Sequence, residues 1–77
     1  MNAKRRAAIQ RIIDKIEELR SDIEALRDEE QEAFDNLPES LQYSEKGERM
    51  EEAVSQLEYS DDSFQEVIDY LTEAIEQ

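Results

Sequence analysis

The stretch Ile9–Leu26, IQRIIDKIEELRSDIEAL, decides the fold. Its apolar residues recur at alternating gaps of three and four positions, and they are Ile9, Ile12, Ile16, Leu19, Ile23 and Leu26. This spacing places the side chains on one narrow face of an α-helix, whereas a strand would need a period of two. Isoleucine fills the a positions of the heptad and mostly leucine fills the d positions. The stripe must therefore be buried against another helix, in this chain or in a second copy.

The pattern predicts a first helix over residues 3–36. The heptad continues through Glu30, Ala33 and Leu37, with Glu30 as an acidic interruption. Ile13 and Phe34 occupy e positions, which makes the apolar face wider than a strict a/d seam. A wider face is typical of a helical bundle rather than of a bare two-stranded coiled coil.

Residues 37–44 are expected to connect two helices. Pro38 ends the first helix because it disfavours the helical conformation at Leu37 and has no backbone donor. One short turn can follow the proline. Two interpretations of the apolar residues stay open: Leu37, Leu41 and Tyr43 fold over the end of the bundle as a plug, or Leu41 and Tyr43 form an exposed contact patch.

A second helix is predicted over residues 45–76, with Ser44 as its N-cap. Gly47 is expected to fray its start. Gaps of four and three again define a seam, made of Met50, Val54, Leu57, Asp61, Phe64, Ile68, Leu71 and Ile75. The capping residues of segment 60–63 leave a helix break open. A continuous helix is favoured because the register is unchanged across the segment.

We therefore expect an all-α protein, with residues 1–77 as a single helical domain folded as an antiparallel hairpin of two long helices. Arg20 would lie opposite Asp61, either paired with it or directed into solvent. Two hairpins would dimerise into a four-helix bundle, although isoleucine at a with leucine at d also favours parallel dimers. The residues expected in the core or dimer interface are Ile9, Ile12, Ile16, Leu19, Ile23, Leu26, Leu57, Phe64, Ile68 and Leu71.

The composition argues against an enzyme, a cofactor site and a metal site. The chain has no histidine and no cysteine, so it lacks the commonest general base, the thiol nucleophile and the nitrogen and sulfur ligands of Cys/His zinc sites. A single glycine cannot supply a phosphate-binding loop. Acidic runs such as 28–32 are read as a solvated helical face. No apolar run approaches the ~20 residues of a membrane span, so no membrane contact is expected.

Charge is distributed unevenly along the chain, whose net charge is -13. Residues 1–27 carry seven basic and five acidic side chains, whereas residues 28–77 carry two basic and seventeen acidic ones. This balance disfavours direct nucleic-acid binding and favours a basic protein partner, because rows of carboxylates can imitate duplex phosphates. The predicted partner-binding residues are Asp28, Glu29, Glu32, Asp35, Glu45, Glu48, Glu51, Glu52, Glu58 and Asp62. The simpler alternative is that the acidic surface only keeps the protein soluble.

The basic cluster at residues 4–6 also has two interpretations. It would pair with the acidic end of the second helix, at Glu73 and Glu76, in the hairpin. Alternatively, together with Arg11, it would form a nucleic-acid-binding arm.

Four segments carry a resemblance to a known group. They are MNAKRR at residues 1–6, IIDKIEEL at 12–19, DNLPESLQ at 35–42 and SEKGERMEEA at 44–53. Together they resemble small acidic coiled-coil hypothetical proteins of phages and mobile elements in Firmicutes. The resemblance implies a bacterial cytoplasm and a phage-related role, and it assigns no site residues.

Two functions follow as hypotheses. The first is a small dimeric inhibitor that blocks a basic site on a host defence or nucleic-acid-handling protein, in the manner of anti-CRISPR or anti-restriction proteins. The alternative is a structural or assembly coiled-coil protein, such as a scaffold or chaperone, that acts through its apolar faces.

Overall fold

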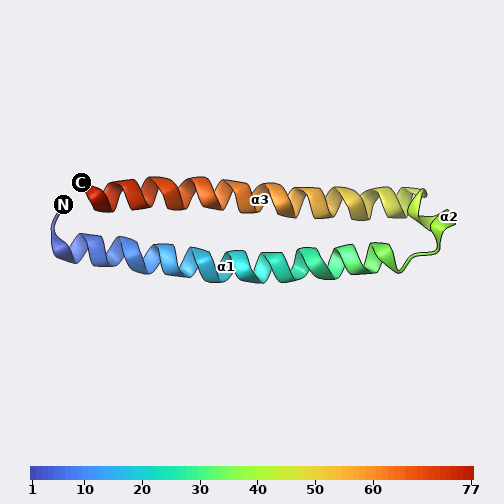
Figure 1. Ribbon diagram of the computed structural model, residues 1–77, viewed down its shortest axis with the longest axis horizontal. Helices are drawn as coiled ribbons and strands as arrows, with labels where there is room; N and C mark the ends of the chain where they lie inside the picture. The colour runs from blue at the N-terminus through green and yellow to red at the C-terminus, as the bar shows by residue number, and fades with distance from the viewer.

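A computed structural model describes all 77 residues and contains three helices and no strand. The helices are α1 (Ala3–Asp35), α2 (Glu39–Gln42) and α3 (Glu45–Glu76). The predicted all-α class is confirmed. Figure 1 shows α1 and α3 side by side and running in opposite directions, with α2 at one end and both chain termini at the other. The Cα atoms span 58 × 15 × 11 Å, so the molecule is a long, flat rod.

Helix α1 begins at a side-chain cap and ends at the proline segment. The side chain of Asn2 accepts a hydrogen bond from the backbone nitrogen of Arg5 at 2.8 Å, which satisfies one of the free donors of the first turn. Asn36 is the C-cap, and its N–H donates to the carbonyl of Glu32 at 3.0 Å. Pro38 then adopts an extended conformation and precedes the short helix α2.

The connector is held by polar contacts, and the apolar plug, one of the two interpretations left open by the sequence, does not form. Leu37 is half-buried, but Leu41 and Tyr43 are 45% and 78% exposed, so the three residues do not close the end together. The Gln42 side-chain amide instead donates to the carbonyls of Phe34 and Leu37, at 3.3 and 3.2 Å. These bonds tie α2 to the end of α1, where the carbonyl of Phe34 also accepts a bond from the backbone nitrogen of Leu37 at 3.0 Å.

Gly47 is buried where α2 meets the first turn of α3. A Cβ atom at this position would lie 2.7 Å from the carbonyl oxygen of Leu41 and 2.6 Å from the carbonyl carbon of Gln42. The prediction that Gly47 frays the helix start is therefore wrong. Its missing side chain lets the connector pack closely on α3, and Ser44 caps the same turn.

Helix α3 continues without a break through segment 60–63. The Ser60 hydroxyl donates to the carbonyl of Leu57 at 2.6 Å, so this serine is satisfied inside the helix and does not cap a new one. The constant register of the apolar residues therefore outweighs the local capping preference.

Two long-range contacts fix how α1 and α3 align. The Arg6 guanidinium reaches the carbonyl of Ile75, and the Arg20 guanidinium reaches Asp61. The same alignment places Ile13 level with Ile68. Those two residues and Val54 are the buried apolar core, each only 7% exposed. The core is thin because two helices cover only one face of each other.

Candidate protein-interaction surfaces

The face of α1 that meets α3 is shifted from the predicted stripe. Its covered or half-covered residues alternate by four and three, and they are Ile9, Ile13, Ile16, Arg20, Ile23, Arg27, Glu30, Phe34 and Leu37. These are the a and e positions of the heptad. The d residues Ile12, Leu19 and Leu26 are 48%, 52% and 55% exposed, so they lie outside the seam between α1 and α3, and their predicted role in the core or dimer interface stays a prediction.

The reason for the shift lies in the e column of α1. Ile13 and Phe34 supply large apolar groups there, and Arg20 meets the acidic interruption of α3. Helix α1 therefore carries three apolar columns, whereas one partner helix covers only two. On α3, the predicted residues Leu57, Phe64 and Leu71 are half-covered and Ile68 is buried.

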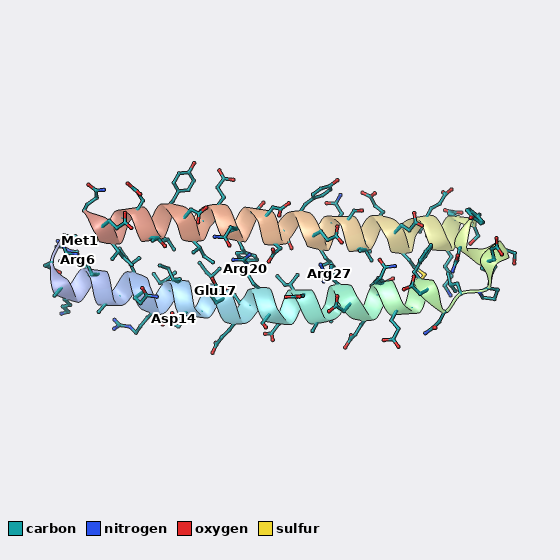
Figure 2. The ribbon with its side chains drawn as sticks, viewed as in Figure 1. Met1, Arg6, Asp14, Glu17, Arg20 and Arg27 are labelled. Atoms are coloured by element: carbon teal, nitrogen blue, oxygen red, sulfur yellow. The ribbon has the colours of Figure 1, made fainter.

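Arg20 forms the polar centre of the helix pair. Its Nε donates to Asp61 Oδ1 at 2.8 Å and its Nη2 to Asp61 Oδ2 at 3.1 Å, a two-point contact that fixes the geometry. Its Nη1 donates to Gln65 Oε1 at 2.7 Å. Figure 2 shows Arg20 and Arg27 extending from α1 toward α3. The pairing left open by the sequence therefore forms, and it satisfies the acidic a/d position of α3.

This contact shifts the ionisation of both partners. The hydrogen bond to Asp61 raises the pKa of Arg20, and the nearby negative charges of Asp61 and Glu17 act in the same direction. The hydrogen bond from Arg20 lowers the pKa of the Asp61 carboxyl, and the positive charge of Arg20 adds to that effect. Asp61 is therefore ionised in the folded protein at neutral pH, and it holds the two helices in one register.

One broad side of the helix pair is polar. Glu17, Glu24 and Gln65 lie together around the Arg20–Asp61 contact. Farther toward the connector, Glu51 and Glu58 from α3 line the same side with Gln31 of α1. This side carries the b positions of α1 and the e positions of α3.

The opposite broad side is apolar. An α-helix turns by about 100° per residue, so a residue two positions along lies on nearly the opposite side. The residues two positions after these polar ones are apolar: Leu19 follows Glu17, Leu26 follows Glu24, and Val67 follows Gln65. Val67 is 44% exposed. We call this side the apolar face, and its members are Ile12, Leu19, Leu26 and Ala33 of α1 with Ala53, Ser60, Val67 and Ala74 of α3.

All ten predicted partner-binding carboxylates are exposed. Only two of them are in ion pairs: Asp28 with Arg27 at 2.7 Å and Glu45 with Arg49 at 2.5 Å. The other eight form no ion pair within the chain, and they are Glu29, Glu32, Asp35, Glu48, Glu51, Glu52, Glu58 and Asp62. They extend over the connector half of both helices, where uncompensated charge creates a strong negative potential.

The basic cluster at residues 4–6 does not form the expected ion pairs with Glu73 and Glu76. Arg6 Nε instead donates to the backbone carbonyl of Ile75 at 3.1 Å, near the last turn of α3 (Figure 2). A cation is favourable there because the helix dipole is negative at its C-terminal end. Lys4 and Arg5 have no acidic partner.

The structure holds no group of three or more acidic side chains arranged to bind a metal ion. None of its helices has the length and hydropathy that a bilayer crossing requires. Comparison with protein-family models, with curated proteins and with solved structures gave no match to this chain.

Proposed function

We propose that this chain is a protein-binding inhibitor that occupies a basic site on its target. The observation that carries the proposal is the set of eight exposed carboxylates that form no ion pair on the connector half of the rod. A basic site gains favourable charge contacts from such a surface, and its association is accelerated by the long-range field.

The class of target follows from the spacing of the charges. Carboxylates on rigid helices recur over distances similar to those between phosphates of a nucleic-acid duplex. A groove that binds DNA or RNA would therefore accept this surface. We propose a host defence or nucleic-acid-handling protein as the target, in a bacterial cytoplasm, which agrees with the resemblance to phage proteins. Nucleic acid itself is not a proposed partner, because the net charge is -13.

The second candidate function is a structural or assembly role, without inhibition. The apolar face favours it, because Leu19 and Leu26 are more than half exposed in a single chain. Exposed apolar surface of this kind marks sites of protein association.

In both candidates we propose that the antiparallel hairpin dimerises into a four-helix bundle. A single hairpin leaves one of the three apolar columns of α1 uncovered. Chains of this size are also marginally stable alone, since they bury only ~60% of their unfolded surface. A second copy would add the missing layer to the core.

Affinity capture from nuclease-treated host lysate tests the first function. Wild-type protein is expected to retain a nucleic-acid-handling protein at low salt, and added duplex DNA is expected to displace it. Simultaneous Glu48→Lys, Glu51→Lys and Glu52→Lys changes should abolish capture without loss of helicity. The matched control changes Glu66, Glu73 and Glu76 to lysine, which shifts the net charge equally in the half of α3 away from the connector and should retain capture.

The two functions differ in their response to salt. Capture that survives high salt, with the connector triple variant as active as wild type, would contradict the inhibitor and support the assembly role. In that case Leu26 and Leu57 should matter more than the surface charges.

A further inference from the structure

The apolar face has a symmetry that indicates how it is covered. Ile12, Leu19 and Leu26 recur every seven residues, so the outer two lie roughly 21 Å apart at ~1.5 Å per residue. Leu19 is the midpoint of this column and also of α1, which spans Ala3–Asp35. A two-fold axis at Leu19 would therefore bring two columns into complete overlap.

Helix α3 has the same centre. Its column on the apolar face runs through Ala53, Ser60 and Val67, and Ser60 lies at the middle of the helix. The Arg20–Asp61 contact shows that Leu19 and Ser60 are nearly level along the rod. One axis can therefore pass beside both residues.

We propose that a second copy of this chain covers the apolar face in an antiparallel orientation, with the two-fold axis beside Leu19 and Ser60. This inference rests on the proposed dimerisation and adds the face and the orientation. Each α1 then packs along the α1 of the other copy, and each α3 along the other α3. The connector of one copy lies over the open end of the other.

Side-chain sizes match in this arrangement. Leu19 meets Leu19 of the second copy at the axis, and Ile12 meets Leu26 on either side. On α3, Val67 of one copy faces Ala53 of the other, while Ser60 allows close approach at the axis. On α3, the pairing of larger Val67 with smaller Ala53 lets the layers interdigitate, and on α1 the large residues meet one another in a continuous apolar layer.

The charges favour this orientation over its alternative. Residues 3–18 of α1 hold five basic and three acidic side chains, and residues 20–35 hold two basic and seven acidic ones. The antiparallel dimer places the first segment against the second. The alternative two-fold axis runs along the rod and places both connectors at the same end. It would bring the connector halves of the two copies together, and each such half, residues 20–61, holds four basic and fourteen acidic residues. Such repulsion disfavours that packing.

One specific pair illustrates the match. Lys15 and Asp22 flank the apolar column of α1 at the same heptad position, and both are exposed and outside any ion pair of the single chain. In the proposed dimer, Lys15 of one copy is nearly level with Asp22 of the other, and the pair occurs twice.

The broad side that carries the apolar face is large enough for a stable dimer. The whole side has a projected extent of 58 × 15 Å between Cα atoms, or roughly 870 Å², and the apolar columns occupy part of it. A stable protein interface buries about 800 Å² on each partner.

Disulfide cross-linking tests the inference directly, because the chain has no cysteine. Leu19→Cys is expected to form a covalent dimer about 100-fold faster than Glu17→Cys on the polar side, owing to its high effective concentration in the complex. A mixture of Ile12→Cys and Leu26→Cys should form mixed dimers in preference to dimers of either variant alone. Circular dichroism of each variant checks that the helices are intact.

Other results would overturn the inference in distinguishable ways. If Leu19→Cys cross-links only when mixed with Ser60→Cys, the two connectors lie at the same end and the orientation is wrong, although the dimer stands. If the wild-type protein sediments as a dimer but none of these variants cross-links, the apolar face is not the interface. A monomeric mass without cross-links contradicts both the proposed dimer and its orientation.

Discussion

The adjacent residues Ile12 and Ile13 give the sharpest test of how α1 packs on α3. Replacing Ile13, which is 7% exposed, with alanine removes three almost fully buried carbon atoms. At ~0.8 kcal/mol per buried methylene, this costs about 2.2 kcal/mol before any cavity term. The same change at Ile12, which is 48% exposed, costs about 1.2 kcal/mol on that scale.

The assay must separate packing within one chain from association. Both substitutions are therefore made in a Leu19→Glu background, which should keep the protein monomeric because Leu19 lies on the apolar face. Urea unfolding followed by circular dichroism gives the free energy of unfolding of each variant. The expected difference between the two variants is about 1 kcal/mol, with Ile13→Ala the less stable.

The opposite order would refute the reasoning. If Ile12→Ala destabilises the monomer as much as Ile13→Ala or more, the a and d columns face α3 and the apolar face does not exist as described. Both substitutions replace isoleucine with alanine, so a difference in stability between them cannot arise from the type of residue that is changed.

Three further predictions concern the connector, the polar centre and the net charge. Gly47→Ala should lower the melting temperature because the new methyl group overlaps the backbone of Gln42. Helix propensity alone would make this change stabilising by about 1 kcal/mol, so an increase in melting temperature would contradict the close packing. The stability advantage of wild type over Asp61→Asn should be full at neutral pH and disappear as the pH falls through the lowered pKa of Asp61, because protonation abolishes the bond to Arg20; an advantage unchanged at low pH would contradict this role. Moderate salt should raise the melting temperature of wild type, since it screens repulsion in a chain of net charge -13; a decrease would show that ion pairs outweigh the repulsion.

Much of the fold could be predicted from local patterns. The three-four spacing from Ile9 onward and the stop at Pro38 predict helices close to those observed. Heptad spacing also indicated that α3 continues through Ser60, where capping preferences suggested a break. Both features depend on residues near one another in the sequence, which is why periodicity detects them.

The choice among faces could not be predicted in this way. Helix α1 offers a, d and e columns, and its pairing depends on which column finds complementary groups on α3. Arg20, at an e position, selects the a and e columns for packing against α3 because it binds Asp61. This contact joins residues that are 41 positions apart in the sequence. The heptad pattern alone groups Leu19 with the residues that pack between helices, because the pattern ignores the polar residues between the apolar ones.

The role of Gly47 was missed for a similar reason. Propensity describes glycine only as a poor helix former. The close contact with the carbonyls of Leu41 and Gln42 arises from the path of the connector, which the local sequence does not specify. Likewise, opposite charges at the open end suggested ion pairs with Glu73, whereas Arg6 binds a backbone carbonyl that composition cannot reveal.

The acidic surface was identified from composition, because uneven charge is visible without a structure. The structure adds that eight of its ten predicted carboxylates form no ion pair. Both surfaces now have separate roles in the proposal: the apolar face joins two copies, and the outward carboxylates of the connector half meet the target.

Sedimentation equilibrium of wild-type and Leu19→Glu proteins shows whether a second copy covers the apolar face. We expect a wild-type mass of about 18.2 kDa, twice the 9.1 kDa chain, and a mass of 9.1 kDa for the variant with its helicity intact. Tyr59→Glu, a change at an exposed residue on the outer side of α3, should leave the dimer mass unchanged. A wild-type mass of 9.1 kDa at every concentration, or an unchanged dimer in Leu19→Glu, would contradict the covering of the apolar face by a second copy.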